Sequence, residues 1–244
     1  MARKILQVSG SDRIDFLENL VSNSVKSLSD GPVYTALLTP QGKYLVDFIM
    51  SARDDSVLLD VDAEAAAGLA QRLNMYRLRA DVQISETTLK VIRGIDNPPE
   101  GAFPDPRHPA LGWRAYVSEG QDQMTPQAWT ALRVEHVIPA TGIELIPNDS
   151  YILEAGFERL HGVDFRKGCY VGQEVTARMK HKTELKKGLT QVKISAEVPV
   201  GTEITNDGKS VGKIYSQANG KAIAYVRFDR TKGDLKAGDA TVKV

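Results

Sequence analysis

The segment beyond Gly188 is divided into short strands by tight turns, and this limits the folds available to it. The turns read Pro-Val-Gly at 199–201, Asn-Asp-Gly at 206–208 and Asn-Gly at 219–220. The last two favour hairpins between neighbouring strands. Strands are predicted over 189–194, 203–205, 209–215, 221–228 and 239–244. Because short strands joined by hairpins close into small all-β barrels, we expect such a barrel over residues 188–244.

The first 94 residues alternate between strand and helix patterns. Strands are predicted over 5–8, 34–39, 43–50, 56–61, 81–85 and 89–93, with a hairpin turn at Pro40-Gln41-Gly42. Apolar residues between Phe16 and Val25 recur at three- and four-residue spacing and predict a helix, and alanine-rich 63–75 predicts another. This order indicates an α+β unit with its helices on one side of an antiparallel sheet.

The middle of the chain is interrupted by prolines. Residues 97–109 are dense in proline and predict a loop or crossover. A strand is predicted over 111–117 and a helix over 125–136, with Thr125 as its cap and Pro126 at its first position. A short helix is predicted over 151–157.

Composition excludes several classes of protein. The single cysteine, Cys169, cannot form a disulfide within the chain and indicates a reducing compartment. No run approaches the roughly 20 apolar residues that span a bilayer. The first residues carry no apolar signal core, so we expect a protein of the bacterial cytoplasm. The 31 basic and 31 acidic residues balance, which argues against a dedicated nucleic-acid coat.

Positive charge is nevertheless concentrated in one segment. Residues 159–193 hold nine basic and three acidic residues, a net charge of +6. A solvated helix face explains such a run as well as an anion-attracting rim does. If the rim is functional, it would suit a carboxylate-rich ligand tail, RNA or an acidic partner.

The segment Lys167–Glu174, hereafter the signature segment, holds the cysteine within this basic stretch. Its sequence is Lys-Gly-Cys-Tyr-Val-Gly-Gln-Glu, and a predicted helix follows it. Thiols beside a lysine and ahead of a helix act as nucleophiles and ligands, although a free cysteine is often simply buried. The glycines would let backbone amides approach an anion or an aromatic ring closely.

Other chemistries lack support in the sequence. There is no second cysteine, no Cys-x-x-Cys, no His-Glu-x-x-His, and neither of the common glycine-rich nucleotide motifs. The four histidines show no ligand spacing, so we expect no metal site, and a cysteine–histidine hydrolase has only weak support.

The signature segment resembles the Lys-Gly-Cys-[Tyr/Phe]-x-Gly-Gln-Glu motif of the YgfZ family of folate-binding proteins. This family is related to the glycine-cleavage T-protein and to mitochondrial factors that mature iron–sulfur proteins. Further similar segments are 16–23, 37–43, 133–135, 175–179 and 211–216. The resemblance therefore covers essentially the whole chain.

The resemblance implies an α+β fold class with two interlocked ferredoxin-like units that form a folate-binding body, followed by a C-terminal small all-β barrel. We expect the first unit at 1–50 and 110–187, carrying the signature segment, the second unit at 51–109, and the barrel at 188–244. Tetrahydrofolate, or a one-carbon derivative of it, is the implied cofactor.

The resemblance also assigns site residues. Lys167 and Cys169 are expected to form the functional pair, with Cys169 as a thiol that acts as nucleophile, transient cluster ligand or contact for a partner. The expected folate-binding residues are Trp129, Arg133, Glu135, Lys167, Cys169, Tyr170, Gln173 and Glu174. The residues expected to shape the site are Gly168, Gly172, Asn23 and Arg178. The Trp129 ring would stack on a pterin, with plain helix packing as the alternative.

The implied function is that of a non-catalytic accessory protein for assembly or repair of iron–sulfur clusters. Its expected partners are folate and iron–sulfur client or assembly proteins, including tRNA-modifying enzymes. One alternative is a folate-dependent one-carbon (aminomethyl) transferase, for which Asp47 and Glu135 are generic carboxylate candidates. Another alternative is an RNA-binding protein, which rests on the basic segment alone.

Overall fold

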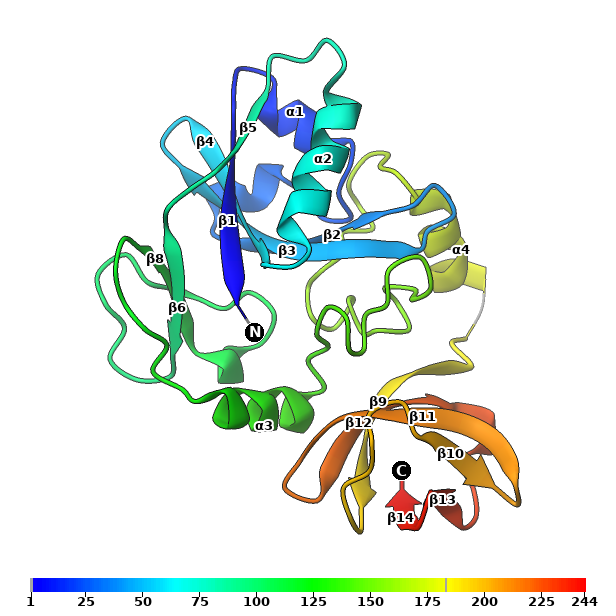
Figure 1. The fold of residues 1–244 in the computed structure, drawn as a ribbon. Helices are drawn as coiled ribbons and strands as arrows, with labels where there is room; N and C mark the ends of the chain where they lie inside the picture. The colour runs from blue at the N-terminus through cyan, green and yellow to red at the C-terminus, as the bar shows by residue number, and fades with distance from the viewer. Residues whose placement is uncertain (1, 183) are drawn as a thin grey trace.

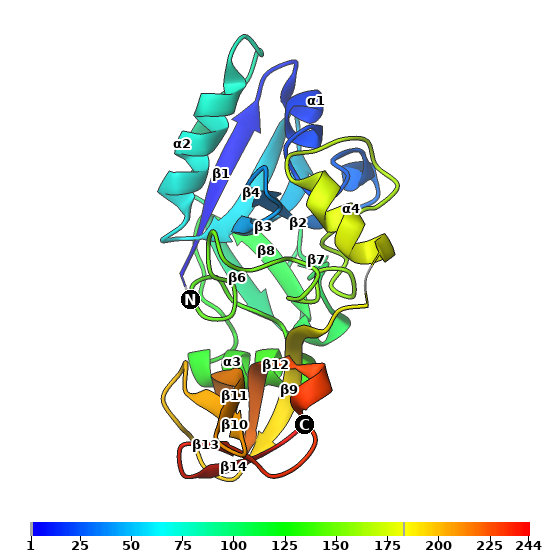
Figure 2. The same cartoon turned by 90° about the vertical axis from the view of Figure 1, so that its right-hand side faces the viewer.

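The computed structural model describes residues 2–182 and 184–244, whose strands form three sheets. One sheet has five strands, one has three, and the third is closed into a barrel. Figure 1 shows a body that contains the five-stranded and three-stranded sheets, with the helix α3 along its lower edge and the barrel beneath that helix. Turned by 90°, the molecule is elongated, with the barrel at one end (Figure 2). Within the described residues, no helix has the length and apolarity needed to cross a membrane.

The body sheet contains five antiparallel strands in the order β2-β3-β4-β1-β5. They are β1 (Arg3–Ser9), β2 (Val33–Leu38), β3 (Tyr44–Arg53), β4 (Ser56–Asp62) and β5 (Gln83–Glu86). The sheet has a hydrophobic core on each face, because successive side chains of a strand point to opposite sides. Along β2, Leu37 belongs to one core and its neighbour Leu38 to the other.

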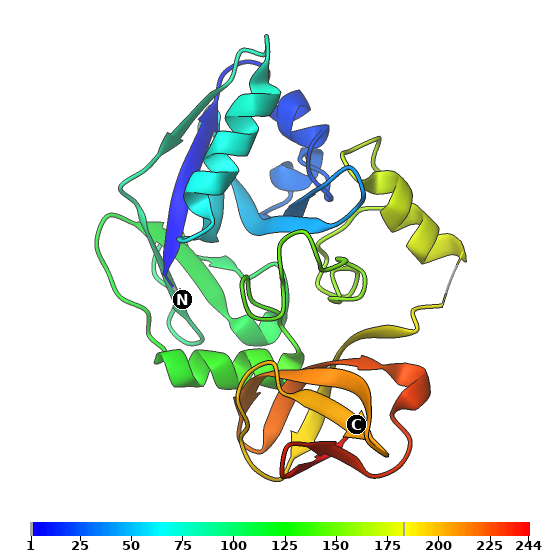
Figure 3. The same ribbon diagram turned by 45° about the vertical axis from the view of Figure 1, so that its right-hand side comes forward.

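The first core lies beneath two helices, α1 (Arg13–Glu18) and α2 (Ala66–Arg77), and the short 3-10 helix η1 (Lys26–Ser29). Figure 3 shows α2 alongside β1. The expected α+β unit with helices on one side of an antiparallel sheet is confirmed. The second core receives α3 (Pro126–His136) and the chain around residues 138–170.

The second sheet has the order β6-β8-β7 and leads into α3. Its strands are β6 (Lys90–Gly94), β7 (Phe103–Pro104) and β8 (Trp113–Val117), with the 3-10 helix η2 (Pro109–Leu111) before β8. The predicted start of α3 is confirmed, because the Thr125 hydroxyl accepts a hydrogen bond from the Ala128 amide and Pro126 is the first helical residue.

The C-terminal strands form the expected barrel, which is closed and has the order β10-β11-β12-β9-β14-β13. The strands are β9 (Lys187–Ile194), β10 (Glu203–Asn206), β11 (Lys209–Ala218), β12 (Lys221–Arg227), β13 (Leu235–Ala237) and β14 (Ala240–Lys243), with η3 (Phe228–Arg230) between β12 and β13. Asp207 and Asn219 adopt positive φ at the two predicted hairpin turns. The short strand β13 was not predicted from the sequence.

Two predicted helices were wrong. The first was expected to continue to Val25 but ends at Glu18, because Val21 leaves the helix to pair with Leu37 in an isolated β-bridge. The second, over 151–157, is a series of turns. Tyr151 pairs with Lys43, and the Glu154 carbonyl accepts the Leu189 amide, so this segment is held by contacts to other parts of the chain.

Two of the expected unit boundaries fall inside described elements, one at residue 51 and the other at residues 109–110, within η2. The boundary at residue 51 lies inside β3, whose strand pairs with β2 and β4 in one sheet, so the sheet itself does not separate the two expected units there. The barrel begins with β9 at Lys187, one residue before the expected boundary. The division of the body into two interlocked units remains a prediction.

The helix α4 (Gln173–Lys182) follows the signature segment and packs against the β2–β3 hairpin. Gly172 has φ +83°, and a Cβ there would lie 2.5 Å from the Thr39 carbonyl oxygen. Opposite it, a Cβ on Gly42 would lie 2.8 Å from the Val175 Cβ. Both positions therefore require glycine, and this close contact sets the place of α4.

Candidate functional site

A cleft lies where the two body sheets, α3 and the segment after α3 meet; we call it the central cleft. It is lined by Arg3, Asp47, Asp62, Arg93, Arg107, Arg114, Trp129, Arg133, Pro139, Ala140 and Thr141. The cavity they enclose has a volume of about 20 Å³, which is room for about one water molecule. Of the predicted folate residues, Trp129 and Arg133 are among its lining.

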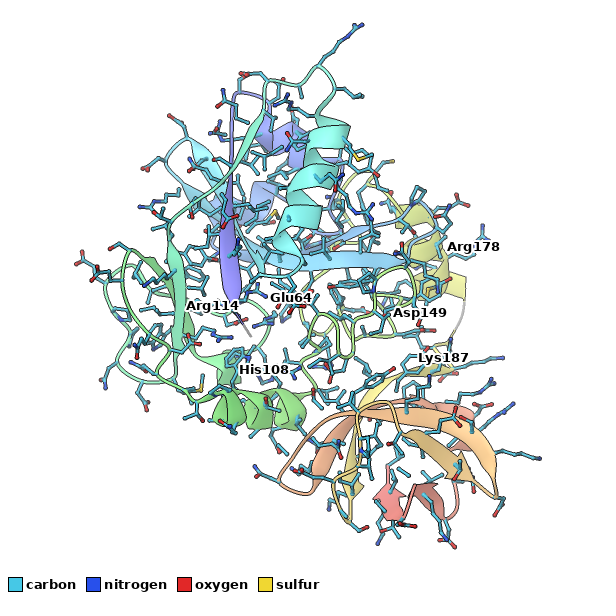
Figure 4. All side chains as sticks on the ribbon, in the orientation of Figure 1. Glu64, His108, Arg114, Asp149, Arg178 and Lys187 are labelled. Atoms are coloured by element: carbon cyan, nitrogen blue, oxygen red, sulfur yellow. The ribbon has the colours of Figure 1, made fainter. Side chains whose placement is uncertain are left out.

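Buried ion pairs connect the two sheets beside this cleft. The Arg114 guanidinium donates to Asp60 and to Asp105, each at 2.6 Å. Arg3 donates to Asp60 at 2.6 Å, and Arg107 pairs with Asp105 at 2.8 Å. Figure 4 labels Arg114 near the N-terminal end of β1. Because β1, β4, β8 and the proline-rich loop supply these residues, the pairs fix the positions of those elements relative to one another.

The charges of this network are mutually compensated. Burial alone would raise the pKa of Asp105, but the neighbouring charges of Arg107 and Arg114 hold that pKa well below its usual value. The same holds for Asp60. Burial raises its pKa, but the charges of Arg3 and Arg114 lower it by more, so the net shift of the pKa is downward. Both carboxylates are therefore ionised at neutral pH.

The Trp129 ring is covered by cationic groups. The Arg93 guanidinium carbon lies 4.4 Å from the centre of the Trp129 ring, within the range of a cation–π contact. Arg107 and Arg114 lie farther away, each at 6.0 Å. Both oxygens of Asp122 accept hydrogen bonds from the Arg93 guanidinium, so Arg93 is held in place over the ring.

Arg133 lies on α3 and extends from the central cleft toward the barrel. It donates to the Ile138 carbonyl at 2.9 Å, to Glu144 at 3.2 Å and to the Ser216 hydroxyl of β11 at 2.7 Å. Its Nε is buried and has no hydrogen-bond partner within the described residues. A buried donor without an acceptor is costly, so this atom marks a place where a ligand atom would be stabilised.

Asp47 is the buried carboxylate of the cleft. The Tyr34 hydroxyl donates to it at 2.9 Å, the Tyr44 hydroxyl at 2.7 Å and the Thr141 hydroxyl at 2.8 Å. Burial, reinforced by the charge of Asp47, raises the pKa of both tyrosines well above its usual value, so they remain donors. From the sequence, Asp47 was only a generic carboxylate candidate, whereas in the structure it lies on the cleft wall.

The Lys167 side chain anchors the signature segment to the body. Its Nζ donates to the backbone carbonyls of Glu18 at 2.7 Å, Val21 at 2.7 Å and Asn23 at 3.0 Å, and the side chain is 1% exposed. Burial lowers the pKa of Lys167 to about 8, although the negative charges of Glu18 and Asp164 act to raise it. All three Nζ donors are thus engaged, which makes Lys167 a positioning group in this structure.

Cys169 is exposed, two residues along the chain from this anchor. Tyr170, by contrast, is buried in the same core as Trp129, and burial raises its pKa to about 12. Gln173 donates to the Gly168 carbonyl at 3.3 Å, and Glu174 pairs with Arg178 on the exposed face of α4 at 3.0 Å. Figure 4 shows Arg178 at the outer edge of the molecule. The signature segment therefore presents a free thiol beside a fixed backbone.

The remaining predicted residues serve contacts elsewhere. Glu135 is outside the central cleft and pairs with Lys221 of the barrel at 2.6 Å. Asn23 donates to the carbonyls of Tyr34 and His161, at 2.9 and 2.7 Å. Across residues 2–182 and 184–244, the cleft lining contains none of the signature segment. Trp129 and Arg133 are thus brought together, while Lys167, Cys169 and Glu135 lie apart from that lining.

Several basic residues of the segment 159–193 have partners in the fold. Lys180 pairs with Glu158, Lys187 lies 3.8 Å from Glu154, and Arg178 pairs with Glu174. Arg159 donates to the backbone carbonyls of His136 and Val137. The side chain of Lys182 lies outside the described residues. These contacts are typical of a solvated, ion-paired surface.

Sequence reasoning missed most of the cleft. Asp47, Asp60 and Arg114 are charged residues flanked by apolar residues within their strands, and this was the available sign of a buried polar network. Arg107 and Asp105 stand in the proline-rich loop, where the sequence showed only a crossover. Asp105 pairs with Arg114, and Arg114 pairs in turn with Asp60, 54 residues earlier in the chain, so the network as a whole is a tertiary property.

Comparison with known proteins supports the architecture. Residues 186–244 match the family described as CAF17, C-terminal beta-barrel domain. The whole chain resembles the crystal structure of glycine cleavage system aminomethyltransferase T from Bartonella henselae, with a TM-score of 0.77 over 98% of this chain and 81% of that one. Sequence identity is 14%, so this likeness shows the fold alone.

Several similar sequences share the name IBA57. The chain is 32% identical over 216 residues to the mitochondrial iron-sulfur cluster assembly factor IBA57 homolog of Mycosarcoma maydis, covering 76% of this chain and 54% of that protein. The Neurospora crassa homolog is also 32% identical, with 51% of its length covered. The chain thus spans about half the length of these two relatives. The human factor IBA57 is 26% identical, covering 96% of this chain and 78% of that protein.

These relatives correct one expectation. We expected a bacterial cytoplasmic protein, but the fungal, mouse and human relatives are all named as mitochondrial. The cytoplasmic location is therefore contradicted.

Proposed function

We propose that this chain is an accessory factor for assembly or repair of iron–sulfur clusters in client enzymes. The proposal rests on its sequence similarity to CAF17/IBA57-type proteins. The similarity to IBA57 factors over most of the chain supports this role. The CAF17-type barrel and the fold shared with the aminomethyltransferase are consistent with it. The clients would include cluster-dependent tRNA-modifying enzymes, and the partners would be client or assembly proteins.

The exposed Cys169 would act at the contact with such a partner. No group of three or more metal-ligating side chains occurs in the described parts of the chain. Cys169 would therefore contribute a single thiolate, as a transient ligand or as a nucleophile, and the partner would supply the other ligands of the cluster. The Lys167 anchor would keep the thiol at a fixed place on the surface.

Complementation tests this role of the thiol. In a strain that lacks the protein, Cys169→Ala is expected to fold normally, because the side chain is exposed, and to leave cluster-dependent enzymes inactive. Ser29→Ala, at an exposed position away from the signature segment, is the control and should restore them. Full rescue by Cys169→Ala would show that the thiol is not needed.

We further propose that the central cleft binds tetrahydrofolate or a one-carbon derivative of it. The observation that carries this proposal is the buried Nε of Arg133, which has no partner among the described residues and belongs to a residue that lines the cleft together with Trp129. The chemistry of the lining fits a pterin: an aromatic face for stacking, the Asp47 and Asp62 carboxylates as acceptors, and arginines as donors. When bound, the folate would supply a carrier for a one-carbon group.

The free space of the cleft limits how this ligand would enter. A volume of about 20 Å³ is far smaller than a pterin ring, and the Arg93 guanidinium occupies the Trp129 face. Folate binding would therefore require Arg93 to leave that face. Arg93 and Asp122 would then control access to the cleft.

Fluorescence titration tests the folate proposal. Tetrahydrofolate is expected to quench tryptophan fluorescence in the parent protein, and Trp129→Phe should lose most of that change. Trp113, the other tryptophan, is bonded to the Asp96 carbonyl and is absent from the cleft lining, so Trp113→Phe is the matched control. If neither calorimetry nor fluorescence detects binding to the parent protein, the folate proposal fails while the role of Cys169 remains testable.

One observation favours a second candidate, a folate-dependent one-carbon (aminomethyl) transferase. The buried Asp47 lies on the cleft wall and is held by three hydroxyl donors, as a carboxylate poised over a folate would need to be. Turnover of tetrahydrofolate with an aminomethyl or formaldehyde-level donor would support this function, with Asp47→Asn abolishing turnover. Folate binding without turnover would favour the accessory role.

A further inference from the structure

The C-terminal end of α2 presents apolar side chains to solvent. The helix packs its inner face, including Leu69 and Leu73, on the first core, yet Met75, Tyr76 and Leu78 are 70%, 38% and 89% exposed. Figure 3 shows this end of α2 at the top of the body, at the far end of the molecule from the barrel. We call residues 72–79 the α2 patch.

The backbone at Leu78 is held in a conformation that a leucine rarely adopts. Leu78 ends α2 with φ +45° and ψ −104°. Glycine adopts positive φ without a Cβ clash, whereas a leucine there is strained. The leucine gains no burial in return. Strained backbone that stability does not require occurs at sites of contact with ligands and partners.

The α2 patch also contains three exposed arginines. Arg77 donates to the Val82 carbonyl, and Arg72 and Arg79 are exposed. Among the described residues, none of the three forms an ion pair. The arginines of the barrel that flank the exposed Phe228 differ, because Arg227 and Arg230 both lie within 3.9 Å of Asp229.

The geometry points to the α2 patch as a docking surface for an acidic protein segment that carries apolar side chains. Methionine, aromatic residues and arginine are the types enriched in protein–protein interfaces, where lysine is depleted. A membrane surface fits less well, because the apolar stripe of α2 is already buried against the body and only the end of the helix is free. Acidic groups on the partner would pair with the arginines while its apolar side chains cover Met75 and Leu78.

A designed peptide tests this surface in the full-length protein. The probe is a fluorescein-labelled helical peptide of about 16 residues with glutamates along one face and leucines along the other. Fluorescence anisotropy should detect binding to the parent protein. The triple variant Arg72→Glu, Arg77→Glu, Arg79→Glu should weaken it by about tenfold or more, and Met75→Ser with Leu78→Ser by about fivefold.

The controls use the barrel group of Arg227, Phe228 and Arg230, in which Asp229 lies close to both arginines. Arg227→Glu with Arg230→Glu, and separately Phe228→Ser, should leave peptide binding unchanged. A peptide with lysine in place of glutamate should bind the triple variant and not the parent protein, which shows that the charges meet directly. Leu78→Gly should raise the thermal midpoint by relieving strain and weaken peptide binding, a pair of effects that a purely structural Leu78 would not give.

Three results would overturn the proposal. The first is a parent protein that does not bind the acidic peptide, and the second is binding that the α2 patch variants leave unchanged. The third is binding of phosphatidylglycerol vesicles or tRNA that depends on the patch while the peptide does not bind, which would assign the surface to a membrane or an RNA. Circular dichroism of each variant identifies loss of fold; because the substituted side chains are exposed, the variants are expected to fold.

Discussion

The central cleft and the signature segment hold their charged groups in opposite ways. In the cleft, Arg114 is buried between Asp60 and Asp105, and charge compensates charge. In the signature segment, Lys167 is buried among three backbone carbonyls, with Glu18 Oε1 as the nearest carboxylate at 3.8 Å. The first arrangement joins distant strands, and the second fixes a short loop so that an exposed thiol has a defined place. The difference separates the region suited to hold a ligand from the region suited to meet a partner.

The largest expected effect breaks the buried ion pairs. Arg114→Met should lower the free energy of unfolding by about 3–5 kcal/mol, because it leaves Asp60 and Asp105 buried with one arginine fewer. Urea denaturation measures this change. Arg178→Met, which removes an exposed arginine from α4, is the matched control and should change stability by less than about 1 kcal/mol.

The same network sets an acid dependence. The pKa values of Asp60 and Asp105 are lower in the folded protein than in the unfolded chain. Their contribution to stability is therefore fully present at a pH above the pKa values of the unfolded chain, and it is lost as the pH falls through the pKa values of the folded protein. Arg114→Met should therefore show a shallower loss of stability between about pH 5 and about pH 2 than the parent protein. Parallel curves for the two proteins would contradict this assignment.

The next effect tests the anchor of the signature segment. Lys167→Met should lower the free energy of unfolding by about 1–3 kcal/mol, because three buried carbonyls lose their donor. The surface variant Lys180→Met serves as the control. The expected cost is smaller than that of Arg114→Met, and the reverse order would mean that the loop, not the ion-pair network, is the more tightly held region.

Lys167 also predicts a dependence on alkaline pH. Its folded pKa of about 8 lies below the unfolded value of about 10.4, so the unfolded chain binds more protons between these limits. The contribution of Lys167 to the free energy of unfolding should therefore rise as the pH increases across that window. Denaturation curves at several pH values, with Lys167→Met subtracted, measure this slope, and a falling difference would contradict the shift.

A smaller effect concerns access to the central cleft. If Arg93 occupies the place of a ligand, Arg93→Ala should tighten tetrahydrofolate binding by roughly tenfold, or about 1.4 kcal/mol. Asp122→Asn, which releases Arg93 without removing it, should have an effect in the same direction. Isothermal titration calorimetry measures both. Unchanged affinity in both variants, with the parent protein still binding, would remove Arg93 from this role and leave the folate proposal intact.

The smallest effect concerns Glu135, which was expected in the folate site and pairs instead with Lys221 of the barrel. Because exposed ion pairs contribute little, Glu135→Gln should leave the thermal midpoint and folate affinity nearly unchanged. Differential scanning calorimetry and the same titration provide the check. A marked loss of folate affinity would return Glu135 to the ligand site.

The elements whose causes are local could be predicted from the amino-acid sequence. The turns at Asn206-Asp207-Gly208 and Asn219-Gly220 set the barrel hairpins, and Thr125 with Pro126 set the start of α3. These features depend on side chains within three or four positions of the residue they control. The signature segment was located for the same reason, as a contiguous run of residues with its own chemistry.

Tertiary structure alone decided what surrounds these elements. The helix expected up to Val25 stops at Glu18 because Val21 pairs with Leu37, and Lys167 is a buried anchor because residues 144 to 149 positions earlier supply its acceptors. The central cleft depends on ion pairs such as that of Arg114 with Asp60, 54 residues apart. A charge becomes a buried partner only when folding removes water from it and brings its counter-charge close, and no local sequence pattern specifies that event.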